Sequence, residues 1–281
     1  MRVDLVTCTT YPTLSDSDAL LAAELTQRGV EVRDRPWNAP DPAWTDPADL
    51  VVIRSSWDYH TDVEGYERWL RAITAAGATV VNPVDLVVWS LRKRYLLELA
   101  GQGVTIPLTS VIEPWMSLRP GWLADDEPVV VKPLVGASSV GVSLVGPERL
   151  DEALAAARHS GRTLLLQEFI DDLGGGEWSL VFFDGEYSHA FQRVAAPAEV
   201  AENGLYAGAS AARVPSADLI AFAADVVPLL PAEPAYVRVD LMVRETGPVV
   251  IEVEVNEPAL RLEFDPEAPA RFADAVLARR A

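Results

Sequence analysis

The hydrophobic pattern of the chain changes part-way along it, and this change restricts the folds it can adopt. Through the first third, short apolar runs alternate with amphipathic segments, two of which end at glycine. This rhythm predicts a small parallel sheet with helices packed on it, in an N-terminal β-α-β domain over residues 1–88. The expected strands are 3–7, 30–33, 50–54 and 79–82, and the expected helices are 17–28 and 66–75.

The rest of the chain predicts hairpins in place of crossovers. A helix over residues 86–100 leads into it, and from residue 129 strands follow one another around short turns such as Asp184-Gly185. We expect a central lid subdomain over 89–166 and a C-terminal antiparallel-sheet domain over 167–281, so the fold class is α/β with an α+β C-terminal part. The expected strands lie within 129–145, 164–170, 176–194, 236–243 and 249–256, and the helices are 149–159 and 268–280.

The charge balance excludes some classes of partner. Acidic residues outnumber basic ones by 42 to 23, which gives a formal net charge of −19. Such a surface repels nucleic acids and anionic membranes, so an anionic ligand would need local cations to bind it. The chain has one cysteine, Cys8, its first residues do not resemble a signal peptide, and no apolar stretch approaches the ~20 residues of a membrane span. We therefore expect a cytoplasmic protein.

Lysine occurs at two positions, Lys93 and Lys132, and arginine is used everywhere else. A lysine ammonium is a compact charge on a flexible stem and suits phosphate oxygens, whereas arginine prefers planar partners. Two surface lysines kept by chance are the alternative, but Lys132 lies in the apolar run VVVKP, where an unpaired cation is costly. The small-residue loop GASSVG follows, and its backbone N–H groups can approach an anion closely. Its candidate anion-binding residues are Gly136, Ser138, Ser139 and Gly141.

Carboxylates gather on two strands near the C-terminus, VRVDLMV and VVIEVEVNEP. With a side-chain period of two, a turn near residue 246 puts Asp240 opposite Glu252 and Arg238 opposite Glu254. Carboxylates this close repel one another unless a cation joins them, and oxygen ligands of this kind suit Mg²⁺. The alternative is a solvated strand face, which the apolar neighbours disfavour. The candidate metal ligands are Asp240, Glu252, Glu254 and Asn256.

Two further segments could contact a ligand. The strand LLLQEFI has backbone groups that could form hydrogen bonds with an adenine ring, and Glu177 could accept hydrogen bonds from ribose hydroxyls. In isolation, the same residues are also compatible with any strand and turn. The segment RSSWDY follows a buried parallel strand, where ligands usually bind, but it could equally cap the next segment. The candidate substrate residues are Arg54, Ser55, Trp57, Asp58, Arg193 and Glu257.

Taken in chain order, these motifs resemble the ATP-grasp superfamily from about Trp89 onward. Within it, the chain looks closest to the glutathione-synthetase and RimK-like carboxylate–amine ligases. The segments IRSSWDYH, WSLRKRYL and GEWSLVFF are similar to the branch containing the cyclo-ligase of D-cycloserine biosynthesis. The resemblance implies these roles: Lys93 and Lys132 on the ATP phosphates under the loop 136–141, Gln167, Glu168 and Ile170 on adenine, Glu177 on ribose, Arg238 with Lys132 in catalysis, and Asp240, Glu254 and Asn256 on Mg²⁺.

The resemblance implies that ATP and Mg²⁺ activate a carboxylate as an acyl phosphate, which an amine or similar nucleophile then attacks. The partners would be small-molecule carboxylates and amines, and by analogy a second copy of the chain in a homodimer. The alternatives are a kinase that stops at the phosphorylated product and a nucleotide-binding protein without turnover. Three features depart from the family pattern: Glu252 shares a face with Glu254, so either could ligate the metal, the loop has serines where many relatives have more glycine, and the segment 195–213 does not align.

Overall fold

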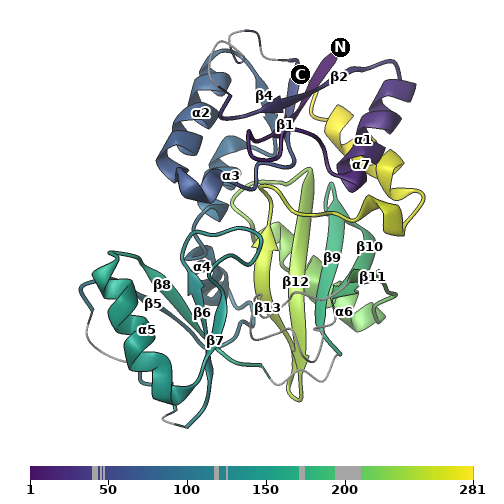
Figure 1. The fold of residues 1–281 in the computed structure, drawn as a ribbon. Helices are drawn as coiled ribbons and strands as arrows, with labels where there is room; N and C mark the ends of the chain where they lie inside the picture. Colours follow the sequence, from purple (N-terminus) through teal and green to yellow (C-terminus); the bar gives the residue numbers. More distant parts are fainter. Residues whose placement is uncertain are drawn as a thin grey trace.

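The computed structural model of the protein describes residues 1–39, 44, 46, 48–116, 120–124, 126–170, 175–193 and 210–280. Most of the unaligned segment 195–213 therefore lies outside the described residues. The strands form three sheets, two of four strands and one of five. Figure 1 shows the N-terminal sheet above the five-stranded sheet, with the second four-stranded sheet set to one side as a separate lobe.

The N-terminal sheet is parallel throughout, with strand order β2-β1-β3-β4, which confirms the predicted β-α-β region. Its central strands are short and buried on both faces, because helices and the C-terminal sheet cover them. The elements are β1 (Arg2–Thr7), α1 (Asp16–Gln27), β2 (Glu31–Pro36), β3 (Leu50–Ile53), a 3₁₀ turn η1 (Tyr59–Thr61), α2 (Val63–Ala75) and β4 (Thr79–Val81).

The helix predicted over 86–100 is instead two short helices, α3 (Val84–Ser90) and α4 (Tyr95–Gly101). A single helix was the wrong prediction, and the reason is a tertiary contact. The backbone N–H of Lys93 donates to the carbonyl of Leu134, at 2.8 Å, and so is not available to the carbonyl four residues earlier in the chain. The break holds Lys93 beside the strand and loop that carry Lys132.

The lobe at the side is built on an antiparallel sheet of order β5-β8-β6-β7. Leucines of α5 pack on one face of this sheet and form a small separate core with its valines. Strand β5 has no counterpart among the predicted elements, because its four residues include two polar ones and carry no clear period. The elements are β5 (Thr109–Ile112), β6 (Val129–Pro133), β7 (Ser143–Val145), α5 (Pro147–His159) and β8 (Leu164–Glu168).

The five-stranded sheet has order β11-β10-β9-β12-β13 and is antiparallel, as predicted for the C-terminal part. The β9–β10 hairpin turns at Asp184 and Gly185, whose φ angles of 49° and 81° match the positive values that such a tight turn requires. Helix α6 lies against one face of the sheet. The elements are β9 (Glu177–Phe183), β10 (Glu186–Arg193), β11 (Ser210–Ala212), α6 (Ala217–Ala224), η2 (Val227–Leu229), β12 (Tyr236–Arg244), β13 (Gly247–Glu254), η3 (Leu262–Phe264) and α7 (Ala268–Leu277).

One hydrophobic core joins the two ends of the chain. Helix α7 packs beside α1 (Figure 1), and Phe272 of α7 stacks on Phe183 of β9 with ring centroids 4.9 Å apart. The same core contains Leu5 of β1 and Tyr236 of β12. Because this core links the parallel sheet to the five-stranded sheet, the segment that follows β3 lies next to the ends of β12 and β13.

Candidate active site

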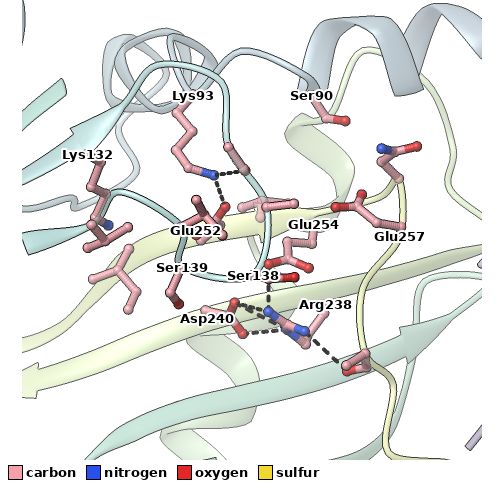
Figure 2. Close-up of a pocket in the computed structure, with 18 of the residues that line it drawn as sticks. Ser90, Lys93, Lys132, Ser138, Ser139, Arg238, Asp240, Glu252, Glu254 and Glu257 are labelled. Carbon is pink, nitrogen blue, oxygen red and sulfur yellow. Dashed lines mark hydrogen bonds and ion pairs between the residues drawn. The ribbon is translucent and has the colours of Figure 1, made fainter. Parts of the chain in front are cut away.

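A cavity of about 270 Å³ lies where the three sheets meet. Strands β6, β9, β12 and β13, the segment between α3 and α4, the loop after β6 and the segment after β3 all contribute to its wall. Figure 2 shows the charged side chains of this wall pointing toward one another from different elements. Fourteen of the predicted residues are among those that line it: Trp57, Lys93, Lys132, Gly136, Ser138, Ser139, Glu177, Arg193, Arg238, Asp240, Glu252, Glu254, Asn256 and Glu257.

The two lysines face this cavity but differ in their partners. The Lys93 Nζ donates to the carbonyl of Gly136 at 3.2 Å and forms an ion pair with Glu252. Burial acts against the charged form of Lys93, but Glu252 outweighs it, so the pKa of Lys93 is raised. Lys132 is 5% exposed, and its ammonium forms no hydrogen bond or ion pair with any other residue that the structure describes. Burial lowers the pKa of Lys132, and the charge of Glu252 offsets this only in part.

Arg238 is the centre of a buried ion-pair network. Its Nε and one terminal nitrogen donate to the two oxygens of Asp240 at 2.8 and 2.7 Å. The same terminal nitrogen donates to Glu254 at 2.7 Å, and the other to the carbonyl of Ala259 at 3.2 Å. The hydroxyl of Ser179 also donates to Asp240, at 2.7 Å. These contacts hold the planar guanidinium in one orientation at the cavity wall.

The strand register that brings these groups together is the predicted one. On β12 and β13, Arg238 pairs with Glu254 and Asp240 pairs with Glu252. The register shifts by one residue between Asp240 and Leu241, and Leu241 pairs with Val250. The extra residue is a β-bulge on β13, and it puts the carboxylate of Glu252, in place of an apolar side chain, opposite Asp240.

Buried carboxylates crowd the cavity. Burial raises the pKa of Glu254 to about 7, although Arg238 acts in the opposite direction. Burial and the charge of Asp240 raise the pKa of Glu177 to about 7, and burial and the charge of Glu254 raise the pKa of Glu257 to about 8. Five carboxyl side chains and four basic ones line the cavity, so a fully ionised wall carries net negative charge and favours a bound cation.

The loop between β6 and β7 covers this charged wall. Ser138, Ser139 and Gly141 all have left-handed backbone, with φ angles of 53°, 58° and 78°. A Cβ atom at Gly141 would lie 2.8 Å from the Cγ of Pro133, so the loop returns too close to β6 for a side chain there. The conformation turns Ser138 and Ser139 to the cavity, where both line the wall (Figure 2).

Comparisons with known proteins agree with this geometry. Residues 93–256 match the family described as the ATP-grasp domain, and they make up more than half of the chain. The chain belongs to the ATP-grasp family. Residues 3–82 match a second family, described as the N-terminal domain of the D-cycloserine synthetase DcsG. These two matches together cover the three sheets that form the cavity.

Two relatives of this ATP-grasp chain extend the comparison. The cycloserine biosynthesis protein DcsG of Streptomyces lavendulae is 31% identical over 260 residues, which cover 82% of this chain and 83% of that one. A crystal structure of the D-cycloserine synthetase DcsG superimposes with a TM-score of 0.88 at 27% identity, covering 100% of both chains. We conclude that the protein is an ATP-dependent carboxylate–amine ligase that acts on small molecules.

More distant structures share the fold alone. The D-alanine–D-alanine ligase of Bacillus anthracis in complex with ATP has a TM-score of 0.71 at 16% identity, over 100% of this chain and 97% of that one. A RimK-domain ATP-grasp protein of Sphaerobacter thermophilus has a TM-score of 0.71 at 20% identity, over 99% and 100%. No described helix of the ATP-grasp chain is long and apolar enough to cross a membrane.

The oxygen-rich wall of the ATP-grasp cavity fits Mg²⁺ in its chemistry. The four predicted metal ligands, Asp240, Glu252, Glu254 and Asn256, all line it, and their oxygen atoms are of the kind that Mg²⁺ prefers. Asn256 is buried, with an amide nitrogen that has no partner among the described residues and an oxygen that accepts from the hydroxyl of Tyr66 at 2.9 Å. Both oxygens of Asp240 already accept from Arg238. Among the described residues, no three His, Cys, Asp or Glu side chains are arranged to hold an ion as they stand.

The three residues predicted for adenine lie outside the cavity wall. The amide nitrogen of Gln167 donates to the hydroxyl of Thr109 at 3.1 Å. The carboxylate of Glu168 accepts from the backbone of Leu108 at 3.0 Å and from Arg244 at 3.2 Å. Ile170 packs in a small apolar cluster that also contains Ile251, a residue of the wall. Glu177 does line the cavity, where its oxygen lies 3.4 Å from Arg193.

The predicted substrate residues after β3 divide into two groups. Trp57 lines the cavity. Arg54 is buried, pairs with Asp18 at 2.8 Å and donates to the carbonyl of Pro258 at 2.6 Å, and Ser55 also donates to Asp18. Asp58 accepts from the indole of Trp37 at 2.7 Å. The structure thus gives Arg54, Ser55 and Asp58 partners within the protein and leaves them out of the wall.

Three aromatic or hydroxyl side chains of the site have no counterpart among the predicted residues. Ser90 and Tyr95 line the cavity, and the Tyr95 hydroxyl accepts from the backbone of Val253 at 3.0 Å. Tyr66 orients Asn256. Each lies in or beside a helix, where serine and tyrosine are common both in the core and on the surface. Their residue types therefore did not indicate a functional site. The motif WSLRKRYL, which contains Ser90 and Tyr95, was the one available indication.

Proposed function

We propose that this ligase closes a ring within one amino acid. The substrate carboxylate would be activated as an acyl phosphate by ATP, and a nitrogen at the end of the same side chain would then attack it. In D-cycloserine, the corresponding ring bond joins the carboxyl carbon to a nitrogen that is itself bonded to oxygen. The expected substrate class is therefore an α-amino acid whose side chain ends in an O–N group, free or acylated.

The observation that carries this proposal is the origin of the cavity wall. Trp57 and Tyr59, from the segment after β3 of the N-terminal sheet, line the same cavity as Lys132 and Arg238. Residues 3–82, which contain both aromatic residues, match the DcsG N-terminal domain. The part of the chain that resembles a cyclising enzyme thus contributes to the wall of the cavity that also holds the phosphate-binding residues, and the acceptor part of the substrate would lie against it.

The charged residues support roles at the phosphate end. Lys132 is buried without a counter-ion among the described residues, and a phosphate oxygen would supply one. Lys93 would bind a second phosphate oxygen once Glu252 releases it. Asp240, Glu254 and Asn256, with Glu252 as a further candidate, would hold Mg²⁺, which when bound neutralises phosphate charge.

Arg238 and the loop over the cavity support the transfer step. A fixed guanidinium beside the phosphoryl group stabilises charge that spreads over its oxygens during transfer. The loop at 136–141 would exclude water, which otherwise hydrolyses an acyl phosphate. Gln167, Glu168 and Ile170 remain proposed adenine contacts, and Glu177 a proposed ribose contact.

The test is phosphate release from Mg–ATP across a panel of amino acids, with product masses. The panel contains β-aminooxy-alanine in both enantiomers, its carbamoylated form, and pairs of ordinary amino acids. We expect turnover with an O–N amino acid and, from the aminooxy compound, a product lighter by one water. Turnover should fall at least about 100-fold in Lys132→Ala and Asp240→Asn, and not in the surface variant Arg149→Ala, whose side chain is 75% exposed.

Other outcomes identify other functions. A linear product that joins two molecules would replace ring closure by intermolecular ligation. A stable phosphorylated product would indicate a kinase. ATP binding without phosphate release for any panel member would indicate a nucleotide-binding protein without turnover.

A further inference from the structure

The carboxylate of Glu257 differs from every other carboxylate of the cavity wall. Glu252 pairs with Lys93, and Asp240 and Glu254 both pair with Arg238. Glu177 lies within 3.4 Å of Arg193. Glu257 lines the same cavity and forms an ion pair with no residue that the structure describes.

The side chain of Glu257 is nevertheless well buried. The residue is 9% exposed, and its carboxylate points into the cavity in Figure 2. Apart from its own backbone N–H, no described group donates a hydrogen bond to it. A buried carboxylate without a partner is costly, so its position indicates a ligand that supplies the missing positive charge.

The neighbouring wall suits an organic cation. Trp57 and Tyr59 line the same cavity, and Glu257 is the charged group that acts most strongly on the Tyr59 hydroxyl. Ser90 lies across from Glu257 in Figure 2 and adds a hydroxyl oxygen. Aromatic rings, a hydroxyl and a carboxylate together are the groups that bind an ammonium ion.

We propose that Glu257 binds the α-ammonium group of the amino-acid substrate, with Trp57, Tyr59 and Ser90 around it. This inference rests on the proposed function only in taking the substrate to be an amino acid, and ring closure is not required for it. The ammonium would offset the negative charge that Glu254 exerts on Glu257. The substrate would then be held at its amino end by Glu257, with its carboxylate toward Lys132 and Arg238.

The test compares Glu257→Gln with wild type, using the amino acid that supports phosphate release and its deamino analogue. Wild type should prefer the amino acid by about 100-fold in kcat/KM, because a buried ion pair to the ammonium is lost with the analogue. In Glu257→Gln, most of this preference should disappear through a higher KM for the amino acid. The KM for ATP and the Mg²⁺ concentration for half-maximal rate should change less than threefold, and Glu257→Asp should recover part of the preference.

Controls separate this role from a structural or metal-binding one. Glu152→Gln, whose side chain is 79% exposed, should behave as wild type. An unchanged preference in a folded Glu257→Gln protein, as judged by its melting temperature, would overturn the proposal. A raised Mg²⁺ requirement with an intact preference would assign Glu257 to the metal instead.

A binding measurement keeps the inference independent of ring closure. If no panel member supports turnover, calorimetric titration of D-serine and of D-cycloserine into the protein with Mg–ADP replaces the kinetics. Both molecules carry the amino group, so binding that weakens at least tenfold in Glu257→Gln would support the proposal. Binding that does not depend on Glu257, or that is absent for both amines, would overturn it.

Discussion

The Lys93 ammonium and the Glu252 carboxylate form an ion pair inside the cavity, although they lie 159 residues apart in the chain. The pair occupies the lysine with an internal carboxylate, and Lys132 is close enough to act on the same group. An incoming phosphate would compete with Glu252 for Lys93. The effect of this competition on ATP affinity can be measured by removing the Glu252 carboxylate.

We predict that Glu252→Gln binds ATP without Mg²⁺ about threefold to tenfold more tightly than wild type. The substitution removes a negative charge next to both lysines and frees Lys93 from its internal partner. Fluorescence or calorimetric titration with ATP in the presence of a chelator measures this. Glu254→Gln is the matched variant, because it removes an equal charge that pairs with Arg238. Weaker Mg–ATP binding in Glu252→Gln alone would instead make Glu252 the main metal ligand.

We predict that Lys132→Met raises the melting temperature of the free protein by roughly 2–4 °C while abolishing turnover. Burial disfavours the charged form of this lysine and lowers its pKa. At pH 7 a buried ammonium without a counter-ion therefore lowers the free energy of unfolding. Methionine keeps the length of the side chain without the charge. Calorimetry with and without ATP checks this, and ATP should stabilise wild type more than the variant. A lower melting temperature in the variant would mean that the ammonium is compensated in the free protein.

We predict that Gly141→Ala lowers kcat at least about tenfold. The residue has a φ of 78°, and a methyl group there would approach Pro133 to 2.8 Å, so the loop must move away from the cavity. Gly161→Ala is the control, because it has a similar φ of 68° with nothing within 4 Å of the added carbon. Both variants should lose about 1 kcal/mol of stability to backbone strain. Equal kcat values in the two variants would contradict a role of this contact in loop placement.

We predict that His189→Gln reduces the loss of stability on acidification between pH 7 and pH 5. His189 is buried and contacts the carbonyl of Leu260 at 2.7 Å, and burial lowers its pKa below 6.5. As the pH falls, His189 therefore takes up a proton in the unfolded chain before it does so in the folded protein. The contribution of the neutral, buried His189 to the free energy of unfolding is present above pH 6.5 and is lost below it. Its charged neighbours are Asp265, Arg271 and Glu263, and they stay unchanged in the variant. Melting temperatures of both proteins across this range check the prediction, and parallel curves would contradict it.

Local patterns in the sequence were enough to predict the alternation of strands and helices, the hairpins and the types of chemical group available. The parallel N-terminal sheet and the Asp184-Gly185 turn follow from local patterns, because periodicity and positive-φ residues act over a few neighbours. The pairing of Arg238 with Glu254 was predictable for the same reason, since both strands belong to one hairpin.

Tertiary structure decided what no local pattern contains. The split between α3 and α4 depends on a hydrogen bond from Lys93 to Leu134, and the partner of Lys93 comes from β13. Groups from several sheets decide which carboxylates of the cavity have an ion-pair partner. Glu254 pairs with Arg238, whereas Glu257 has no such partner among the described residues. Burial and charge pairing are properties of the packed chain, and only packing brings residues so far apart in sequence within a few ångströms of one another.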